Sequence, residues 1–264
     1  MPASAATLLL AALAALAPAA APAEPSRPAS PLPASAPRER RPAQPEVVKP
    51  DARGASPRAP TRSSAWIARL VTPTPAWTSP RAAGSSRTLA PLGRWTGGPV
   101  GLLVLEARDE WLRVLLPDRP NGRSAWVEAD RVRLVRTKFR VEVDLSERRV
   151  TLLRAGRVTR RFRAVVGAPG TPTPRGRFAI YERARQPDGD GFLGPFALHL
   201  TAHSRVLDDY GGGRGRVAIH GRGGSSLLDP LGSAASHGCI RIDNAAVRDL
   251  ARMLAPGVPV VVAS

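Results

Sequence analysis

The stretch from Ser236 to Arg241 reads SHGCIR and contains the only cysteine in a chain of 264 residues. A single thiol cannot form a disulfide within its own chain, and an unpaired cysteine in an exported protein points to a reactive thiol. The thiolate is the attacking form, and a free cysteine titrates at about 8.5. Cys239 is therefore a candidate nucleophile that needs a base nearby.

Two histidines are candidates for that base. His237 lies two residues before Cys239, and His220 lies upstream in the motif IHG. If His220 ends a buried strand and SHGCIR lies on a returning segment, the Gly/Ser-rich stretch from Arg222 to Ala235 becomes a loop that folds back over the site. The spacing alone leaves open which histidine is the base.

The residues around the cysteine favour a reactive site over a core position. A lone buried cysteine often packs as a small hydrophobic residue. Ser236 and His237 are poor core residues, however, and Arg241 is costly to bury without a partner. Gly221 and Gly238 have no Cβ, so the backbone at both positions can approach a bound carbonyl and direct N–H groups at it.

This pattern resembles the L,D-transpeptidase catalytic domain, also called the YkuD domain. The family signature is a histidine followed, after a loop, by Ser/Thr-His-Gly-Cys, a hydrophobic residue and Asn or Arg, and every position is filled here. FRVEVDLSERRVTLLRAG (139–156) resembles the opening hairpin of the family, and VGAPGTPTPRGRF (166–178) resembles its conserved turn and strand. GPF (194–196) and the final helix and strand also fit, so the resemblance covers about residues 138–263.

The resemblance implies a catalytic role for each residue of the motif. Cys239 attacks, His220 is the general base, and the backbone carbonyl of Gly221 orients the imidazole. The amides near His237, Gly238 and Cys239 form the oxyanion hole.

Three further residues are candidate substrate contacts, namely Arg241, Ser236 and Tyr181. Arg241 stands where better-known members of the family have Asn, although Arg occurs there in many relatives. A guanidinium can hold a substrate carboxylate bidentately. A solvated or ion-paired arginine without a substrate contact is the alternative for Arg241.

The implied substrate is a peptidoglycan stem tetrapeptide, which is cleaved after its third-position diamino acid with release of D-alanine. The acyl group then passes to an amine of another stem or of a protein. Transfer to water would make the enzyme an L,D-carboxypeptidase. No metal or organic cofactor is expected. The sequence does not identify the acceptor, the diamino acid or the type of envelope.

Two rival functions stay open on the sequence alone. A zinc-dependent wall hydrolase could combine His199 and His203 with the residues of the motif. The stretch HLTAH lacks the glutamate of a helical zinc protease, however, and its surroundings are typical of a strand. The other rival is a catalytically inactive protein that binds the cell wall.

The N-terminal residues predict an exported protein. Residues 1–23 are interpreted as a signal peptide, because Leu8 to Leu13 is an apolar run too short to span a bilayer and small residues follow it. No Lys or Arg precedes the run, so an uncleaved anchor is the alternative. Residues 24–64 are rich in Pro, Ala and Arg, which predicts a disordered linker. The expected location is extracytoplasmic, in the cell wall or the periplasm.

Residues 65–136 predict a small β domain of their own. Short stretches rich in β-formers are separated by turn clusters such as PDRPNG (117–122). The predicted strands are 66–70, 99–105, 111–116 and 124–127. The pattern of two tryptophan strands around a Pro-Asn-Gly turn resembles bacterial SH3-like domains, which implies a small β-barrel. Binding of wall polymers and a purely structural role are both open.

Residues 137–264 predict the catalytic domain, and its patterns are mostly those of strands. In residues 141–150 and 158–166, apolar residues either alternate with polar ones or follow one another, as in two strands joined by the turn RAGR (154–157). Asp243 can cap a helix that carries Val247, Leu250, Ala251 and Leu254 on one face. We therefore expect a mostly β, β-rich α+β fold, with an L,D-transpeptidase-like β-sandwich and one or two helices.

The formal net charge is +18, and every basic residue except Lys49 and Lys138 is an arginine. The arginines are scattered and aromatic residues are few, so a nucleic-acid partner is not expected. The charge indicates either a compositional bias or attraction to anionic wall polymers or a membrane face. Peptidoglycan stem peptides are the expected partners, and we expect a monomer.

Overall fold

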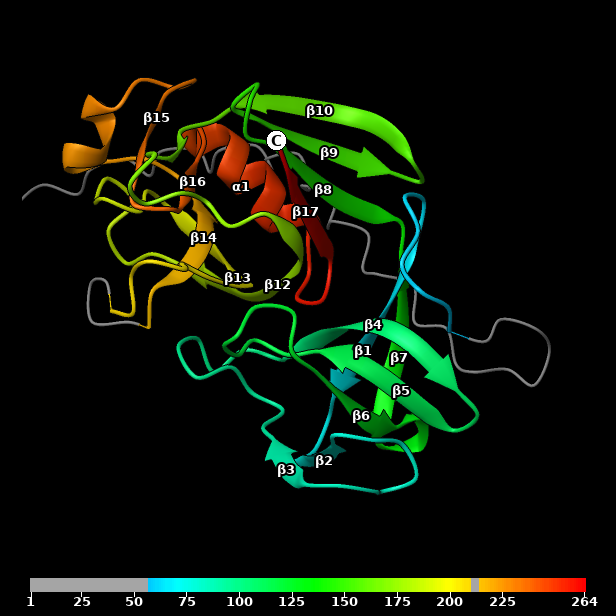
Figure 1. Cartoon of the computed structure of the whole chain (residues 1–264). Coiled ribbons are helices and arrows are strands. Elements are labelled where there is room, and N and C mark those ends of the chain that lie inside the picture. The colour runs from blue at the N-terminus through cyan, green and yellow to red at the C-terminus, as the bar shows by residue number, and fades with distance from the viewer. Residues whose placement is uncertain (1–56, 210–213) are drawn as a thin grey trace, which may run out of the picture. The chain divides into compact units, whose positions relative to one another are not determined.

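Strands dominate the part of the chain that the structure, a computed structural model, describes, residues 57–209 and 214–264 (Figure 1). The mostly β fold expected from the sequence is confirmed. The predicted signal peptide and residues 24–56 of the predicted linker lie outside the described residues. Among the described residues, no helix is long and apolar enough to cross a membrane.

Seven strands form an antiparallel sheet in the N-terminal half, in the order β3-β2-β6-β5-β4-β1-β7. Four of them, β1, β4, β5 and β6, correspond to the predicted strands. The bounds are β1 Ala65–Leu70, β2 Thr74–Trp77, β3 Ser86–Leu89, β4 Gly101–Arg108, β5 Trp111–Leu115, β6 Ser124–Glu128 and β7 Val132–Thr137, with the 3-10 helix η1 at Ala129–Arg131 before β7. The sheet has an apolar core of its own, which includes Trp66, Leu102, Leu112 and Val127. The resemblance to SH3-like domains stays a prediction.

Eight strands form the second sheet, in the order β10-β9-β8-β17-β12-β13-β14-β16. Its bounds are β8 Phe139–Asp144, β9 Arg149–Arg154, β10 Arg157–Arg163, β12 Gly176–Arg185, β13 Phe196–His203, β14 Arg216–His220, β16 Ile240–Arg241 and β17 Pro259–Ala263. A separate two-stranded sheet pairs β11 (Val166–Gly167) with β15 (Ala234–Ser236), and the 3-10 helix η2 spans Gly224–Leu228.

The one α-helix of the described residues is α1, Asn244–Met253. The carboxylate of Asp243 accepts a hydrogen bond from the backbone N–H of Ala245 at 2.8 Å, as an N-cap residue does. The buried face of the helix carries Val247, Leu250 and Ala251, as the sequence predicted.

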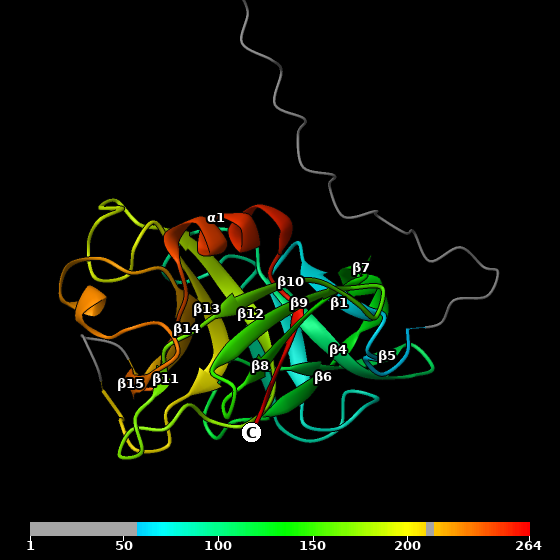
Figure 2. The ribbon, with the colours of Figure 1, turned by 90° about the horizontal axis from the view of Figure 1, so that it is seen from above.

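The helix covers one face of the second sheet, so the side chains on the opposite face point away from the helix. α1 packs against β13 and β14 (Figure 2). Val217, Ile219 and Ile240 belong to the apolar cluster on the helix side. Because side chains alternate along a strand, Ala218 and His220 project from the opposite face.

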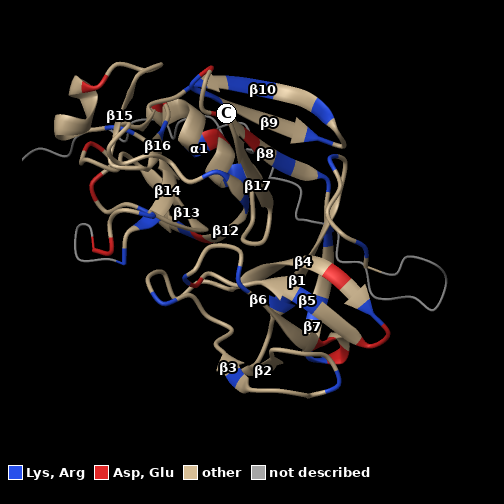
Figure 3. Cartoon of the chain, viewed as in Figure 1, with Lys and Arg blue, Asp and Glu red and all other residues tan. Residues whose placement is uncertain are grey.

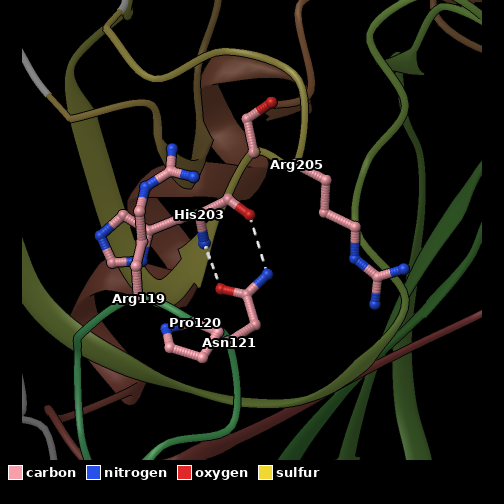
Figure 4. A pocket seen from close by; sticks show the side chains of 6 residues that line it. Arg119, Pro120, Asn121, His203 and Arg205 are labelled. Carbon is pink, nitrogen blue, oxygen red and sulfur yellow. Dashed lines mark hydrogen bonds between the residues drawn. The ribbon is translucent and has the colours of Figure 1, made fainter.

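A hairpin of the first sheet contacts the end of β13. The side chain of Asn121 accepts a hydrogen bond from the backbone N–H of His203 and donates one to its carbonyl oxygen, both at 2.8 Å (Figure 4). A pocket of about 520 Å³ lies beside this contact and is lined also by Arg119 and Arg205. Asn121 thereby completes the backbone hydrogen bonding of a buried strand end.

We predict that Asn121→Ala lowers the free energy of unfolding by about 1–3 kcal/mol, because two backbone groups of His203 lose their partner. Urea denaturation of the full chain measures this change. Arg123→Ala, at an exposed position of the same hairpin, is the matched control and is expected to change stability by less than about 0.5 kcal/mol. Equal effects of the two substitutions would contradict the role of the amide.

Candidate active site

The parallel pairing of β14 with β16 brings the two parts of the sequence motif together. Ile219 lies in register with Ile240, and His220 lies in register with Arg241. One residue earlier, Cys239 therefore lies opposite Ala218. With strands about 4.8 Å apart and a rise of about 3.3 Å per residue, the Cα atoms of His220 and Cys239 are roughly 8 Å apart on one face. Their side chains can meet across this distance.

His220 is fully buried and neutral. Its Nδ1 lies 2.7 Å from the carbonyl oxygen of Gly221. A carbonyl only accepts hydrogen bonds, so Nδ1 carries the proton and Nε2 is left with a lone pair. Nε2 is buried and makes no hydrogen bond. Burial, helped by the positive charge of Arg241, lowers the pKa of His220 to about 4, and the backbone groups of Gly221 and Leu193 oppose this only in part.

Cys239 is partly exposed, but its sulfur lies in a poorly solvated position. Burial raises the pKa of the thiol, while the nearby backbone of Ala218 and the positive charge of Arg241 act in the opposite direction. The resting site thus holds a neutral thiol and a neutral imidazole at pH 7. The thiolate must form during the reaction, by transfer of the proton to a base.

Hydrogen bonds from two hydroxyl groups hold the turn before Cys239. Ser236 Oγ donates to the carbonyl oxygen of Cys239 at 2.6 Å and accepts from the amide of Gly238 at 3.1 Å. Thr173 Oγ1 donates to the carbonyl oxygen of Gly238 at 3.0 Å. Gly238 has a φ of +113°, which a residue with a Cβ rarely adopts. The Gly238 amide is therefore occupied, and Ser236 is buried inside the turn instead of facing a ligand.

The segment after His220 is fixed by a residue that the sequence did not single out. Asn244, at the start of α1, accepts from the Arg222 amide at 2.7 Å and donates to the Arg222 carbonyl at 2.9 Å. A Cβ at Gly221 would lie 2.3 Å from Asn244 Oδ1, so only glycine fits there. The two hydrogen bonds of Asn244 therefore fix the position of the Gly221 carbonyl, and with it that of the His220 imidazole.

Arg241 is buried beside the histidine and forms an ion pair with Asp229. Its guanidinium lies 4.9 Å from the ring centroid of Phe192, and the Phe192 and His220 ring centroids are 6.1 Å apart. Arg241 Nε has no hydrogen-bond partner. The structure shows Arg241 ion-paired, and its contact with a substrate carboxylate stays a prediction. Phe192 covers both side chains from the β12–β13 loop.

Two other candidates, Tyr181 and His237, have side chains in different surroundings. Tyr181 packs against the apolar cluster of the first sheet, and the Arg216 guanidinium lies 5.1 Å from its ring centroid. The structure does not bring Tyr181 to Cys239. His237 is exposed. Among the residues that the structure describes, no group of three or more His, Cys, Asp or Glu is placed to hold a metal ion.

The part of the chain that carries this site matches a known protein family. Residues 138–262 match the family model of the YkuD L,D-transpeptidase catalytic domain. Two curated relatives, each named putative L,D-transpeptidase YkuD, come from Bacillus licheniformis and Bacillus subtilis. They are 34% identical over 119 residues and 31% identical over 124 residues. The matches cover 45% and 47% of this chain, and the chain spans 62% and 65% of the length of these relatives.

Solved L,D-transpeptidases also align with this chain. One from Xylanimonas cellulosilytica is 28% identical, with 48% of this chain and 61% of that chain covered and a TM-score of 0.34. L,D-transpeptidase 3 from Mycobacterium tuberculosis, in complex with a faropenem-derived adduct, is 15% identical, with 62% and 91% covered and a TM-score of 0.41.

We predict that the domain of residues 138–262 loses stability as the pH falls from about 6.5 towards 4. The pKa values of His199, His203 and His220 are all lowered to about 4, chiefly by burial. Histidine in an unfolded chain titrates at about 6.5, so the unfolded state binds more protons in this window. Each histidine then lowers the free energy of unfolding by up to about 1.4 kcal/mol per pH unit.

Urea denaturation at pH 7 and pH 5 tests this dependence. The expected result is a lower midpoint at pH 5, with a smaller difference for His203→Gln, which removes one of the three groups. Equal midpoints at both pH values would show that the histidines are not buried in neutral form.

Proposed function

We propose that the chain is a peptidoglycan L,D-transpeptidase in which Cys239 is the nucleophile and His220 is the general base. The observation that carries the proposal is the buried His220 ring, whose Nδ1 is bound to the Gly221 carbonyl and whose Nε2 lone pair shares a face with Cys239. A base held in one tautomer on the same sheet face as a thiol is the arrangement that acyl transfer needs.

The first step forms an acyl-enzyme. His220 Nε2 takes the thiol proton as the sulfur attacks the carbonyl carbon of the diamino acid in a stem tetrapeptide. The C–N bond to D-alanine breaks, and the proton on His220 passes to the leaving amine. The amide of Cys239, with that of His237, is the proposed donor pair for the oxyanion, because Ser236 Oγ occupies the Gly238 amide.

The second step transfers the acyl group. An acceptor amine attacks the thioester and gives a proton to His220 Nε2. The C–S bond then breaks, and the proton passes from His220 to the sulfur, which restores the thiol. An amine of another stem gives a wall cross-link, an amine of a protein gives anchoring, and water gives carboxypeptidase activity. Arg241 holds its positive charge next to the sulfur while it is paired with Asp229. We assign it to stabilising the thiolate as it forms.

The same proposal places the enzyme outside the cytoplasm. L,D-transpeptidases act on peptidoglycan peptides, and these lie beyond the membrane. Residues 1–23 are the proposed export signal and residues 24–64 the proposed linker. Residues 65–136 are the proposed SH3-like domain, and residues 137–264 the catalytic domain.

A covalent adduct tests the proposed chemistry. Incubation of the full chain with a carbapenem is expected to raise its intact mass by the mass of one carbapenem, because the thiol opens the lactam ring without a leaving group. Cys239→Ser is expected to give no adduct. His220→Ala is expected to slow acylation by about 10²–10⁴-fold, the usual contribution of a general base.

His203→Gln is the matched control, since it changes another buried histidine outside the site. Its acylation rate is expected to equal that of the wild type. An unmodified wild-type protein, or an adduct that survives Cys239→Ser, would overturn the proposal.

The hairpin of β9 and β10 supports a second partner, an anionic wall polymer. Residues 147–163 carry seven arginines and one acidic residue, and β10 is an exposed edge strand (Figure 3). Arg157 lies directly opposite Arg154, and Arg163 lies opposite Arg149. Like charges in such positions destabilise a sheet, and an anionic chain bound along the edge would relieve the repulsion.

We predict that Arg157→Glu/Arg161→Glu weakens binding to a poly(glycerol phosphate) chain and reduces the salt dependence of that binding. Arg58→Glu/Arg81→Glu changes the net charge equally at exposed positions elsewhere and is the control. Titrations at two salt concentrations measure both effects. If the two double variants bind alike, the hairpin is not a specific surface and only the net charge matters.

A further inference from the structure

A loop of the first sheet covers part of the face that carries the site. Glu182 on β12 is buried, and one of its carboxylate oxygens accepts three hydrogen bonds from this loop. The donors are the Trp95 amide at 3.2 Å, the Thr96 amide at 2.9 Å and Thr96 Oγ1 at 2.9 Å. A Cβ at Gly93 would lie 2.4 Å from the Glu182 carboxyl carbon. The loop is thus built to approach this carboxylate closely.

This anchorage presents Trp95 against His199. The two ring centroids are 4.9 Å apart, and the Arg216 guanidinium lies 4.9 Å from the indole centroid. Arg216 is fixed in turn by the Leu200 carbonyl at 2.9 Å. Nevertheless 48% of the Trp95 surface stays exposed. A large aromatic side chain is therefore held rigidly with much of its surface open to solvent.

Trp95 and His199 lie in line with Cys239, the proposed nucleophile, along a row that runs across the strands of the sheet. Glu182 is in register with His199, and His199 is in register with Ala218, which lies opposite Cys239. Residues in register across a sheet project from the same face. The row therefore runs from Cys239 over the small side chain of Ala218 to His199 and Trp95.

The length of the row matches an extended peptide. Two strand spacings separate the Cα atoms of Cys239 and His199, which is about 10 Å. An extended chain advances about 3.3 Å per residue, so it covers this distance in three residues. Burial keeps His199 neutral, since it lowers the pKa to about 4. The neutral imidazole and the exposed part of the indole suit an aliphatic side chain or an amide plane, and the Arg216 guanidinium on the indole disfavours a cationic group.

We propose that Trp95 and His199 form a binding subsite for the peptide arm of the substrate, about three residues from the carbonyl that Cys239 attacks. The subsite rests on the proposed transpeptidase function and gives the first sheet a part in substrate selection. Trp95 is a specificity-determining residue that contacts the peptide, and Glu182 is a positioning residue that acts through the loop.

The test compares a long substrate with a short one. Trp95→Ala is expected to raise KM for a stem tetrapeptide about tenfold, the upper range for one lost aromatic contact, with kcat little changed. Its rate of acylation by a carbapenem is expected to stay within twofold of the wild type, because that molecule does not reach the subsite. Trp95→Phe keeps a ring and is expected to recover most of the affinity.

Leu92→Ala is the matched control, since Leu92 lies in the same loop and is 57% exposed. Donor and acceptor are separated by measuring acyl-enzyme formation and then its reaction with an added acceptor peptide. A raised KM in either half-reaction supports the subsite and identifies which peptide fills it. The same kinetics for Trp95→Ala and Leu92→Ala would overturn it, as would an equal loss of carbapenem acylation and peptide turnover.

The two proposals can fail separately. If the wild type takes up no carbapenem, the transpeptidase function fails. If the wild type is acylated but Trp95→Ala turns over the tetrapeptide like the wild type, the function stands and the subsite is wrong.

Discussion

The parallel pairing of β14 with β16 is the constraint on which the site depends. The register of Ile219 with Ile240 buries both isoleucines under α1, and the alternation of the strands then turns His220, Cys239 and Arg241 to the other face. A slip by one residue would exchange the two faces, placing the polar side chains in the core. The apolar core therefore fixes the arrangement of the proposed catalytic residues, although none of its own residues belongs to that set.

Burial sets the protonation state of that arrangement. A fully buried imidazole and a poorly solvated thiol both favour their neutral forms, and the structure adds the positive charge of Arg241 within reach of the sulfur. Asp229 and Phe192 keep this arginine in place from two sides. In the proposed reaction, such a site keeps the thiol protonated until a substrate carbonyl is bound. It would protect a lone cysteine from adventitious oxidation.

The motif residues, the capped helix and most of the strands could be predicted from the sequence, because each is marked by a local pattern of residues. Cys239 and His220 could be paired from the motif, and Asp243 from its place before an amphipathic run. The contacts that need distant segments could not be predicted. Two examples are the ion pair of Arg241 with Asp229 and the hydrogen bonds from the Trp95 loop to Glu182. In neither case does the sequence around either partner contain a pattern that predicts the contact. Tyr181 packs against the first sheet, next to a shift of register between Ile180 and Glu182, and its expected contact with the substrate stays a prediction.

The most direct test of a neutral Cys239 thiol beside a neutral His220 is the pH dependence of Cys239 alkylation by iodoacetamide, since the rate of alkylation follows the thiolate fraction. The account predicts a rate that is low at pH 6 to 7 and still rising above pH 8.5, because burial raises the pKa of the thiol. A rate that reaches its plateau below pH 7 would contradict it. Such a plateau would mean a preformed thiolate with a charged His220, which the buried imidazole and its lowered pKa do not allow.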